Sequence, residues 1–431
     1  MTSDSTTASS PYLQAYVWIW LPHSIAPVVA GVLSRDGNQL VFNYGRSYLA
    51  RADAIAIYAP ELPLQAGAIR LLSGLAMPSC LRDASPDAWG RRVLINRKCG
   101  RMGTDAAGAE LEELTYLLES GSDRIGALDF QLSATGYAPR KAQQASLEDL
   151  MTAADKVGRG LPLSAELDAA LLHGTSLGGA RPKVLIQDGN RTYIAKFSAS
   201  NDLYNVVKAE FIAMRLAAKV GLDVASVQLT SALGKDVLLI ERFDRQRHEA
   251  GWCRRAVVSA LTMLELDEMM AAYASYEKLA EIIRHRFTEP RATLRELFSR
   301  IVFNILCGNT DDHARNHAAF WDGHHLALTP AYDICPQSRA GQEASQAMLI
   351  CGPDRRSQIA TCIATAPNFL LRTEDAVSIV NTQVQLIERE WNSVCLEANL
   401  SQVDRHYFWR RQFLNPFAFY GAPQEIRIPR G

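Results

Sequence analysis

The sequence predicts an α+β protein in which a mixed leading segment precedes a small strand-rich lobe and a larger, mostly helical lobe. Short β-like runs divided by turn residues fill residues 15–50, and two further strand patterns flank a turn at 188–190. Helical periodicity dominates beyond residue 256. At 431 residues the chain is too long for one simple core, and the usual domain size gives roughly two to three units.

Composition narrows the class of protein. Apolar residues make up 48% of the chain and charged residues 21%, which is typical of a soluble globular protein. The formal net charge is −1, so the chain lacks the basic surplus needed to hold nucleic acid by phosphate neutralisation alone. We therefore expect any contact with DNA to depend on a partner protein.

The cysteines and the start of the chain favour a cytoplasmic location. The eight cysteines form no Cys-x-x-Cys pair and no cluster with histidines, so we interpret them as buried thiols in a reducing compartment. The Ser/Thr-rich residues 1–10 carry no basic residue and make a poor signal peptide. Pro22, His23 and Pro27 interrupt the apolar stretch at 16–33, which favours strands over a membrane span.

Residues 1–145 are expected to form an N-terminal α+β subdomain behind a flexible extension at residues 1–11. In the first sheet, Arg35-Asp36-Gly37-Asn38 suits a tight hairpin turn. Residues 135–146 have the composition of an exposed connection, and we place the subdomain boundary there. The expected elements are a sheet within 15–50, helices at 86–94 and 111–118, and a strand at 125–131.

Residues 146–246 are expected to form the small lobe and residues 247–431 the large lobe. Gly221 is a plausible left-handed cap for the long helix of the small lobe. In the small lobe we expect helices at 164–173 and 203–220, strands at 184–187 and 192–197 around Asp188-Gly189-Asn190, and a strand at 237–243. In the large lobe we expect helices at 256–272, 276–287, 293–308, 374–398 and 402–414.

The most informative motif is Asn309-Thr310-Asp311-Asp312-His313-Ala314-Arg315-Asn316, followed beyond a short hairpin by Asp333. An aspartate five residues before an asparagine, with a second aspartate farther on, is the spacing by which kinase-like folds place a catalytic base and two metal ligands. Asp311 is the candidate base, and Asn316 and Asp333 are the candidate ligands of a hard cation such as Mg²⁺. Together with the order of elements, this predicts a bilobal protein-kinase-like fold with an additional N-terminal α+β subdomain.

A glycine-rich loop precedes the first strand of the small lobe. Gly178, Gly179 and Ala180 would let backbone N–H groups approach phosphate oxygens, and Lys183 could add positive charge. Taken alone, the motif is more often a loop whose glycines serve turn geometry. Its position before a strand and ahead of the Asp311 motif favours nucleotide binding.

Three further positions complete the predicted nucleotide site. Strand alternation places Lys196 opposite Ala195 and Phe197, where its ammonium could bridge the α- and β-phosphates of ATP; a solvent-facing lysine is the alternative. Glu210 shares a helical row with apolar residues and could pair with Lys196. Glu241 and Phe243 end the last strand of the small lobe, where a hinge would hold adenine. A strand that simply ends in charged residues would have the same sequence pattern.

The motif has other readings at individual residues. Asp311 could be a helix cap, Asn316 a turn residue and Asp333 an N-cap. Asp312 is an alternative base, and His313 is better read as a structural hydrogen-bonding residue than as a metal ligand. The joint appearance of these residues in kinase order is what favours phosphoryl transfer.

These segments together resemble the HipA family of bacterial serine/threonine kinases, the toxins of type II toxin–antitoxin pairs. The matching segments are residues 176–183, Lys196, residues 239–244, residues 309–316 and residues 330–333, with looser similarity at 81–87 and 121–127. The resemblance implies an ATP- and Mg²⁺-dependent protein kinase. It also implies a small DNA-binding helix-turn-helix antitoxin (HipB-like) as partner, an aminoacyl-tRNA synthetase as a possible substrate, and Ser176 as a candidate autophosphorylation site.

Two other functions are compatible with the sequence. Small-molecule kinases of the aminoglycoside or choline type also use an Asp-x-x-x-x-Asn loop, but they usually carry histidine where this chain has Asn309. A catalytically silent scaffold that acts only as an antitoxin-binding co-repressor is the second alternative. The presence of Lys196, Asp311, Asn316 and Asp333 argues against silence.

Overall fold

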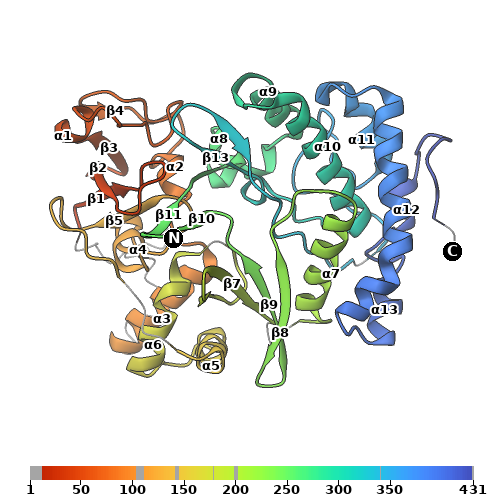
Figure 1. The fold of residues 1–431 in the computed structure, drawn as a ribbon, viewed down its shortest axis with the longest axis horizontal. Helices are drawn as coiled ribbons and strands as arrows, with labels where there is room; N and C mark the ends of the chain where they lie inside the picture. Colours follow the sequence, from red (N-terminus) through yellow and green to blue (C-terminus); the bar gives the residue numbers. More distant parts are fainter. Residues whose placement is uncertain are drawn as a thin grey trace, which may run out of the picture. The chain divides into compact units, whose positions relative to one another are not determined.

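The fold is described from a computed structural model that covers residues 12–102, 111–140, 145–177, 179–198, 202–339 and 341–429. The predicted extension at residues 1–11 lies outside these ranges. The chain divides into two compact units. The first comprises Met1–Asn201, Thr230–Val258 and Trp321–His324, and the second comprises Asp202–Leu229, Ser259–Phe320 and His325–Gly431. Figure 1 shows the elements of each.

The first unit begins with a five-stranded antiparallel sheet of order β4-β3-β2-β1-β5. Asp36 pairs with Gln39 across β2 and β3, and Gly37 has a φ of 58°, so the predicted two-residue hairpin turn is confirmed. The predicted strand at 125–131 is also present, although it starts later. The strands are β1 (Gln14–Ile19), β2 (Val28–Asp36), β3 (Gln39–Tyr44), β4 (Ala68–Ile69) and β5 (Leu128–Gln131).

Helices of the first unit follow most of the predicted pattern, with one addition. The predicted helices at 86–94 and 111–118 correspond to α3 and α4, and that at 164–173 to α6. The unpredicted α5 starts at Ser146, whose side chain accepts a hydrogen bond from Asp149 N as an N-cap. These helices are α1 (Arg46–Leu49), α2 (Ser79–Arg82), α3 (Ala88–Met102), α4 (Glu113–Glu119), α5 (Leu147–Gly158) and α6 (Ala165–Leu171), and the 3₁₀ turn η2 (Leu172–Ser176) follows.

A second antiparallel sheet, of order β6-β7-β9-β8, carries the predicted nucleotide-binding residues. Ala195 and Phe197 lie in a buried apolar cluster with side chains of α3 and α5, including Trp89 and Met151. Alternation along β7 therefore turns Lys196 to the opposite face, as predicted. The strands are β6 (Lys183–Asp188), β7 (Arg191–Phe197), β8 (Val227–Ala232) and β9 (Lys235–Glu241).

The predicted helix at 256–272 is wrong. A β-hairpin precedes this segment, which itself forms a strand, one helical turn and a 3₁₀ turn. The β-branched pair Val257 and Val258 favours the strand. Glu265, with a φ of 58°, interrupts any continuous helix. The elements are β10 (Arg245–His248), β11 (Gly251–Arg254), β12 (Ala256–Ser259), α8 (Ala260–Met263) and η3 (Glu268–Tyr273).

The second unit is mostly helical. Its α10 is buried along most of its length and packs against α9 and α12 (Figure 1). Helix α7 lies along α12, where ion pairs join Arg215 to Glu397 at 2.8 Å and Lys219 to Glu390 at 2.9 Å. The helices are α7 (Val206–Lys219), α9 (Tyr276–Arg286), α10 (Pro290–Cys307), α11 (Ile359–Thr365), α12 (Thr373–Glu397) and α13 (Gln402–Phe408), and β13 (Ala318–Trp321) and β14 (Leu326–Leu328) form a hairpin.

Of two helix ends predicted in the second unit, the end of α7 is confirmed and the end of α13 is not. Gly221, with a φ of 91°, follows α7 as predicted. Helix α13 stops at Phe408, short of the predicted 414, because Trp409 is extended and Arg410 has a φ of 63°.

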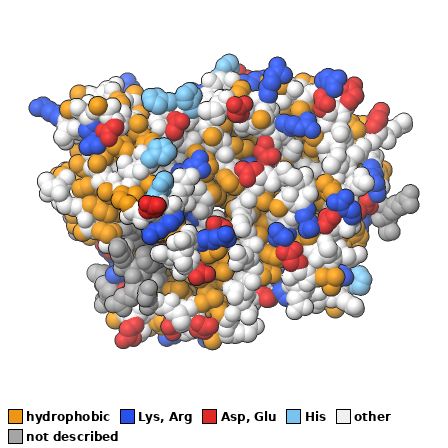
Figure 2. Space-filling model, viewed as in Figure 1, with side chains coloured by type: hydrophobic (Ala, Val, Ile, Leu, Met, Phe, Trp, Pro, Cys, Tyr) orange, Lys and Arg blue, Asp and Glu red, His pale blue; other side chains and the backbone are white. Residues whose placement is uncertain are grey.

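Within the described parts of the chain, no helix combines the length and apolar character that crossing a bilayer requires. Basic and acidic side chains are interspersed on the face shown in Figure 2.

Candidate active site

The loop at residues 309–316, in the second unit, begins where α10 ends. Gly308 takes the left-handed conformation, with a φ of 74°, that closes the helix and turns the chain. Asn309 is buried, its Nδ2 donates to Asn304 Oδ1 over 3.1 Å, and its carbonyl accepts from Gln346 Nε2 over 2.9 Å. Buried amide contacts therefore fix the start of the loop.

Asp311 and Asn316, the predicted base and one predicted metal ligand, lie in this loop. Asn316 Nδ2 donates to the carbonyl oxygen of Asp311 over 3.0 Å. Because the amide nitrogen is engaged within the loop, Oδ1 is the atom of Asn316 that could coordinate a cation. Asp311 itself is exposed, so its carboxylate is accessible to a substrate hydroxyl.

Asp333, the second predicted metal ligand, follows the β13–β14 hairpin. Its φ of 58° is uncommon for a residue other than glycine. The neighbouring Tyr332 donates from its hydroxyl to the carbonyl oxygen of Arg315 over 2.7 Å. The hairpin thus returns the chain to the 309–316 loop.

Asp311 and Asp333 interact electrostatically. Although the Asp311 side chain is exposed, partial desolvation by the surrounding protein raises the pKa of its carboxyl group; His313 lowers that pKa, and the charge of Asp333 raises it. A divalent cation would relieve the repulsion between the two carboxylates. Over the described residues, no three His, Cys, Asp or Glu side chains gather as a metal site, so a cation here would draw on Asn316, water and phosphate oxygens as well.

Asp312, the alternative base, points into the interior. Its side chain is 1% exposed, and it accepts hydrogen bonds from the Tyr276 hydroxyl and, over 3.1 Å, from Ala347 N. The Tyr276 hydroxyl also lies 3.0 Å from His317 Nε2. Burial raises the pKa of Asp312 to about 7 and lowers that of His317 to about 3. An enclosed carboxyl cannot meet a substrate, so the geometry assigns Asp312 to anchoring the loop.

His313 and Glu210 are the other predicted residues of the second unit. His313 Nδ1 has no hydrogen-bond partner among the residues that the structure describes. Glu210 lies on α7, which Asn205 caps by accepting from Lys208 N over 3.0 Å. Glu210 is only 2% exposed. A buried carboxylate needs a cationic or hydrogen-bonding neighbour, and the pairing of Glu210 with Lys196 stays a prediction.

Two lysines of the first unit lie side by side. Lys183 on β6 and Lys196 on β7 are directly opposite each other in the antiparallel register. They are 5% and 7% exposed, so neither is a solvent-facing strand lysine. Residues directly opposite each other in adjacent strands project from the same face, so Lys183 and Lys196 share one face of the sheet.

The glycine-rich loop contacts the start of α3. Gly179, with a φ of 92°, donates from its backbone N–H to Asp87 Oδ2 over 2.5 Å, and its carbonyl accepts from Trp89 N over 3.2 Å. A β-carbon at position 179 would lie 2.2 Å from Lys183 Nζ, which places that ammonium against the loop. Ala180 is exposed, and Gly178 lies outside the described residues.

The other predicted site residues of the first unit are Ser176, Glu241 and Phe243. Ser176 is 2% exposed, and its hydroxyl donates to the carbonyl oxygen of Asp123 over 3.3 Å, so it faces inward in this conformation. Glu241 ends β9 and forms a 3.4 Å ion pair with Arg191. Phe243 is half-buried just beyond. Binding of adenine by Glu241 and Phe243 stays a prediction.

Comparisons with known families agree with this architecture. Residues 175–391 match the family described as the HipA-like C-terminal domain, which is about half of the chain. The chain belongs to the HipA family. Residues 24–131 match the HipA N-terminal domain, so both parts of a HipA protein are represented.

Curated relatives of this HipA-family chain are named as kinases. It is 28% identical over 178 residues to the kinase Y4mE of Sinorhizobium fredii, covering 37% of this chain and 41% of that protein. It is 27% identical over 187 residues to the serine/threonine-protein kinase toxin HipA of Shewanella oneidensis, covering 37% and 42%. The chain thus spans less than half the length of these two relatives.

Among solved structures, the HipA-family chain is similar to a chain of the Shewanella oneidensis complex of HipA, HipB and operator DNA. The TM-score is 0.65 at 18% sequence identity, and the match covers 91% of this chain and 93% of that one. At this level of identity the match establishes the fold. The predicted α+β, kinase-like fold class is therefore confirmed.

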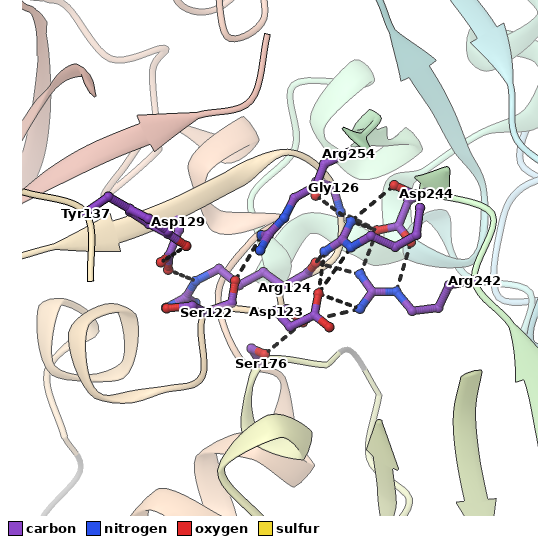
Figure 3. Close-up of polar contacts among 11 residues, drawn as sticks. Ser122, Asp123, Arg124, Gly126, Asp129, Tyr137, Ser176, Arg242, Asp244 and Arg254 are labelled. Atoms are coloured by element: carbon purple, nitrogen blue, oxygen red, sulfur yellow. Dashed lines mark hydrogen bonds and ion pairs between the residues drawn. The ribbon is translucent and has the colours of Figure 1, made fainter. Parts of the chain in front are cut away.

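Sequence reasoning missed a buried ionic cluster that involves the motif at residues 239–244. Arg242 pairs with Asp123 at 3.0 Å and Asp244 at 2.8 Å, and Arg245 pairs with the same two acids at 2.7 and 2.9 Å (Figure 3). We call Asp123, Arg242, Asp244 and Arg245 the arginine–aspartate cluster. Burial opposes ionisation of Asp123, yet Arg242 and Arg245 hold its pKa well below the usual range.

The arginine–aspartate cluster has an architectural role. Asp244 Oδ2 also accepts from Gly126 N over 2.7 Å, which ties the end of β9 to the loop before β5. In Figure 3 the Ser176 side chain points toward Asp123 from below the cluster. The sequence signal is the charged run Glu241 to Asp244 at the end of apolar β9, which the sequence predicts to be a hinge.

Proposed function

We propose that the chain is an ATP-dependent serine/threonine-protein kinase that acts as the toxin of a type II toxin–antitoxin pair. The observation that carries the proposal is the placement of Asp311, Asn316 and Asp333 around one loop and one hairpin in a HipA-family chain. Two neighbouring carboxylates and an amide oxygen are oxygen ligands of the kind Mg²⁺ uses at phosphoryl-transfer sites.

In this proposal the residues of the second unit serve the acceptor and the metal. The Asp311 carboxylate orients the substrate hydroxyl and accepts its proton as the bond to phosphorus forms. Its raised pKa helps, because a more basic carboxylate accepts a proton more readily. Asn316 Oδ1 and Asp333 would hold Mg²⁺. When bound, the ion neutralises charge on the phosphate oxygens.

The residues of the first unit would serve the nucleotide. Lys183 and Lys196 supply positive charge for the phosphates, and the backbone of Gly178, Gly179 and Ala180 would supply N–H donors, with the Gly179 N–H exchanging its bond to Asp87 Oδ2 for a phosphate oxygen. The proposal gives Glu210 of the second unit the task of orienting Lys196. It gives Glu241 and Phe243 contact with adenine. Support comes from the buried, adjacent lysines and the left-handed Gly179.

Autophosphorylation of Ser176 is proposed as self-inactivation. A phosphate on Ser176 adds roughly −1.5 to −2 charges. Because the hydroxyl is 2% exposed and faces Asp123, the phosphorylated side chain does not fit the present loop conformation. The loop would have to leave its contacts with α3, which would remove Gly179 and Lys183 from the nucleotide.

The partners and location of the protein also belong to the proposal. A small helix-turn-helix antitoxin would bind the chain and make the contact with DNA, and the net charge of −1 agrees with indirect DNA contact. The substrate would be a cytoplasmic protein, with an aminoacyl-tRNA synthetase as the candidate, and its phosphorylation would arrest translation.

The test is incubation of the purified full chain with γ-labelled ATP and Mg²⁺ in the presence of total soluble protein. We compare wild type with Asp311→Asn and Asp333→Asn, and with Glu249→Gln as control, since Glu249 is an exposed acid between β10 and β11. Label on protein should appear with wild type and control and fall about 10²–10⁴-fold in the two variants.

Other outcomes contradict the proposal in distinct ways. Label on small molecules alone would indicate a small-molecule kinase. Antitoxin binding without label in any protein would indicate a silent co-repressor. A Ser176→Ala variant should keep its activity longer than wild type during incubation with ATP; equal labelling and equal loss of activity would remove Ser176 from the scheme.

A further inference from the structure

A pocket of about 320 Å³ lies in the second unit, away from Asp311 in sequence and lined by no acidic residue. It is formed by the segment that follows Asp333 and by the turn that follows α13. Its lining consists of Arg339, Gly341, Gln342, Arg410, Arg411, Asn415 and Pro416. Three guanidinium groups therefore meet around one concave space.

Arg339 carries the strongest signal. Its side chain is 7% exposed, and its Nη1 donates to the Gln342 carbonyl over 3.1 Å. The other two nitrogens, Nε and Nη2, are buried and have no hydrogen-bond partner among the described residues. These two N–H groups form the parallel edge of a guanidinium that binds carboxylate or phosphate oxygens in pairs. Burial lowers the pKa of Arg339, which is the expected response of a cation held without a carboxylate.

Arg410 and Arg411 stand at the same pocket, and backbone carbonyls hold them there. Arg410 Nη1 donates to the Pro429 carbonyl over 2.9 Å, and Arg411 Nη2 donates to the Arg339 carbonyl over 3.3 Å. The Arg411 guanidinium also lies over the Tyr407 ring, 4.5 Å from its centroid. Neutral carbonyls orient the arginines without neutralising them.

Two other buried arginines, both in the first unit, have carboxylate partners. Arg242 and Arg124 are fully buried and pair with Asp244 and Asp129 at 2.8 and 3.0 Å. A buried charge normally has such a partner, because desolvation without compensation is costly. Within the described residues, no carboxylate pairs with Arg339, so the compensating anion is expected to come from outside the chain.

We propose that this pocket is a binding site for the phosphate group of a small anionic ligand. A dianionic group with several oxygens can accept from the Nε–Nη2 edge of Arg339 while Arg410 and Arg411 neutralise its charge. Because the Arg339 edge is screened from water, the flexible Arg411 side chain must shift as the ligand enters. The volume lies at the lower end of the range for small-molecule sites. A recessed arginine and a net charge of −1 disfavour duplex nucleic acid.

The site would also act on the segment that carries Asp333. Arg339 follows Asp333 on the same stretch, which is tied to the end of α10 by the 2.9 Å bond from Gln337 N to the Gly308 carbonyl. An anion bound to Arg339 would therefore restrict the motion of the segment from Asp333 to Arg339. The binding site itself goes beyond the proposed kinase activity and does not depend on it.

The test is calorimetric titration of the purified full chain with inorganic phosphate. The double variant Arg410→Gln/Arg411→Gln should weaken saturable binding by at least about tenfold, since each guanidinium supplies a charge-assisted hydrogen bond. Arg339→Gln should do the same. The control Arg372→Gln/Arg389→Gln, which changes two exposed arginines of the second unit, should bind as wild type does.

A Lys196→Gln variant separates this site from the proposed nucleotide site. Phosphate binding that survives Lys196→Gln and is lost in Arg410→Gln/Arg411→Gln supports the proposal. Binding lost in Lys196→Gln alone, absence of saturable binding by wild type, or displacement of phosphate by duplex DNA would each overturn it. Kinase activity is not the readout, so failure of the proposed function leaves the outcome interpretable.

Discussion

The arginine–aspartate cluster of the first unit and the loop at 309–316 of the second unit both concentrate charge, but in opposite ways. In the cluster, two acids and two arginines alternate, and each carboxylate contacts two guanidinium groups. At the loop, the negative charge of Asp333, which follows the β13–β14 hairpin, acts on Asp311 and raises its pKa. Balanced buried charges specify architecture, whereas like charges held together indicate a site that awaits a ligand.

The largest effect should come from unbalancing the cluster. Asp244→Ala removes the shared partner of Arg242 and Arg245 and leaves two buried cations with less compensation. We expect a loss of about 3–5 kcal/mol in the free energy of unfolding, measured by urea denaturation. The control Glu249→Gln changes an exposed acid of the same unit and should leave the unfolding curve unchanged. Equal curves for both variants would refute the architectural role.

A pH-dependent effect should follow from Asp312. Its folded pKa of about 7 exceeds the unfolded value of about 4, so its protonation stabilises the fold fully below pH 4, and this contribution disappears as pH rises to 7. Asp312→Asn cannot take up that proton. Asparagine is instead neutral at every pH, like the protonated acid, so we expect the variant to match wild type near pH 4 and to be more stable by on the order of 3 kcal/mol near pH 7.

The measurement for Asp312 is urea unfolding of both proteins at several pH values between 4 and 7. His317, whose folded pKa is lowered to about 3, acts in the opposite direction. Because His317 is present in both proteins, the difference between them isolates Asp312. A difference that does not change with pH would show that Asp312 does not titrate in this range.

The smallest effect on stability should come from Asp311. Since Asp333 and burial disfavour its charge, Asp311→Asn should leave the free energy of unfolding unchanged or raise it by less than about 1 kcal/mol, solvent screening being strong at an exposed carboxylate. Thermal unfolding at pH 8 would measure this. A clear loss of stability would mean that Asp311 is a structural residue like Asp244, and the contrast between the two regions would fail.

Local patterns predicted what local physics determines. The Asp36-Gly37 turn, the strands around Asp188-Gly189-Asn190 and the helix that ends before Gly308 were found because turn residues and periodicity act over a few neighbours. Helix α5 was missed although Ser146 and Asp149 form its cap. The segment at 256–272 was misread because its apolar spacing fits a helix until Val257 and Val258 are weighed as strand formers.

Contacts between distant segments could not be predicted. Asp123 meets Arg242 across more than a hundred residues, and no spacing rule links them. The sequence likewise could not tell which of Asp311 and Asp312 faces solvent, since only the position of Tyr276 and Ala347 decides it. The inward orientation of Ser176 depends on the hydrogen bond from its hydroxyl to the carbonyl oxygen of Asp123. Sequence placed the chemistry-bearing residues, and tertiary packing sets their environments.

One consequence of the Gly179 geometry concerns how this loop can vary. Any side chain there would collide with the Lys183 ammonium and would also have to adopt a φ of 92°. Alanine at 179 would therefore displace the lysine tip or rebuild the turn. The absence of an atom at this position is what keeps a positive charge pressed against the peptide backbone, so a single methyl group would be enough to separate the two.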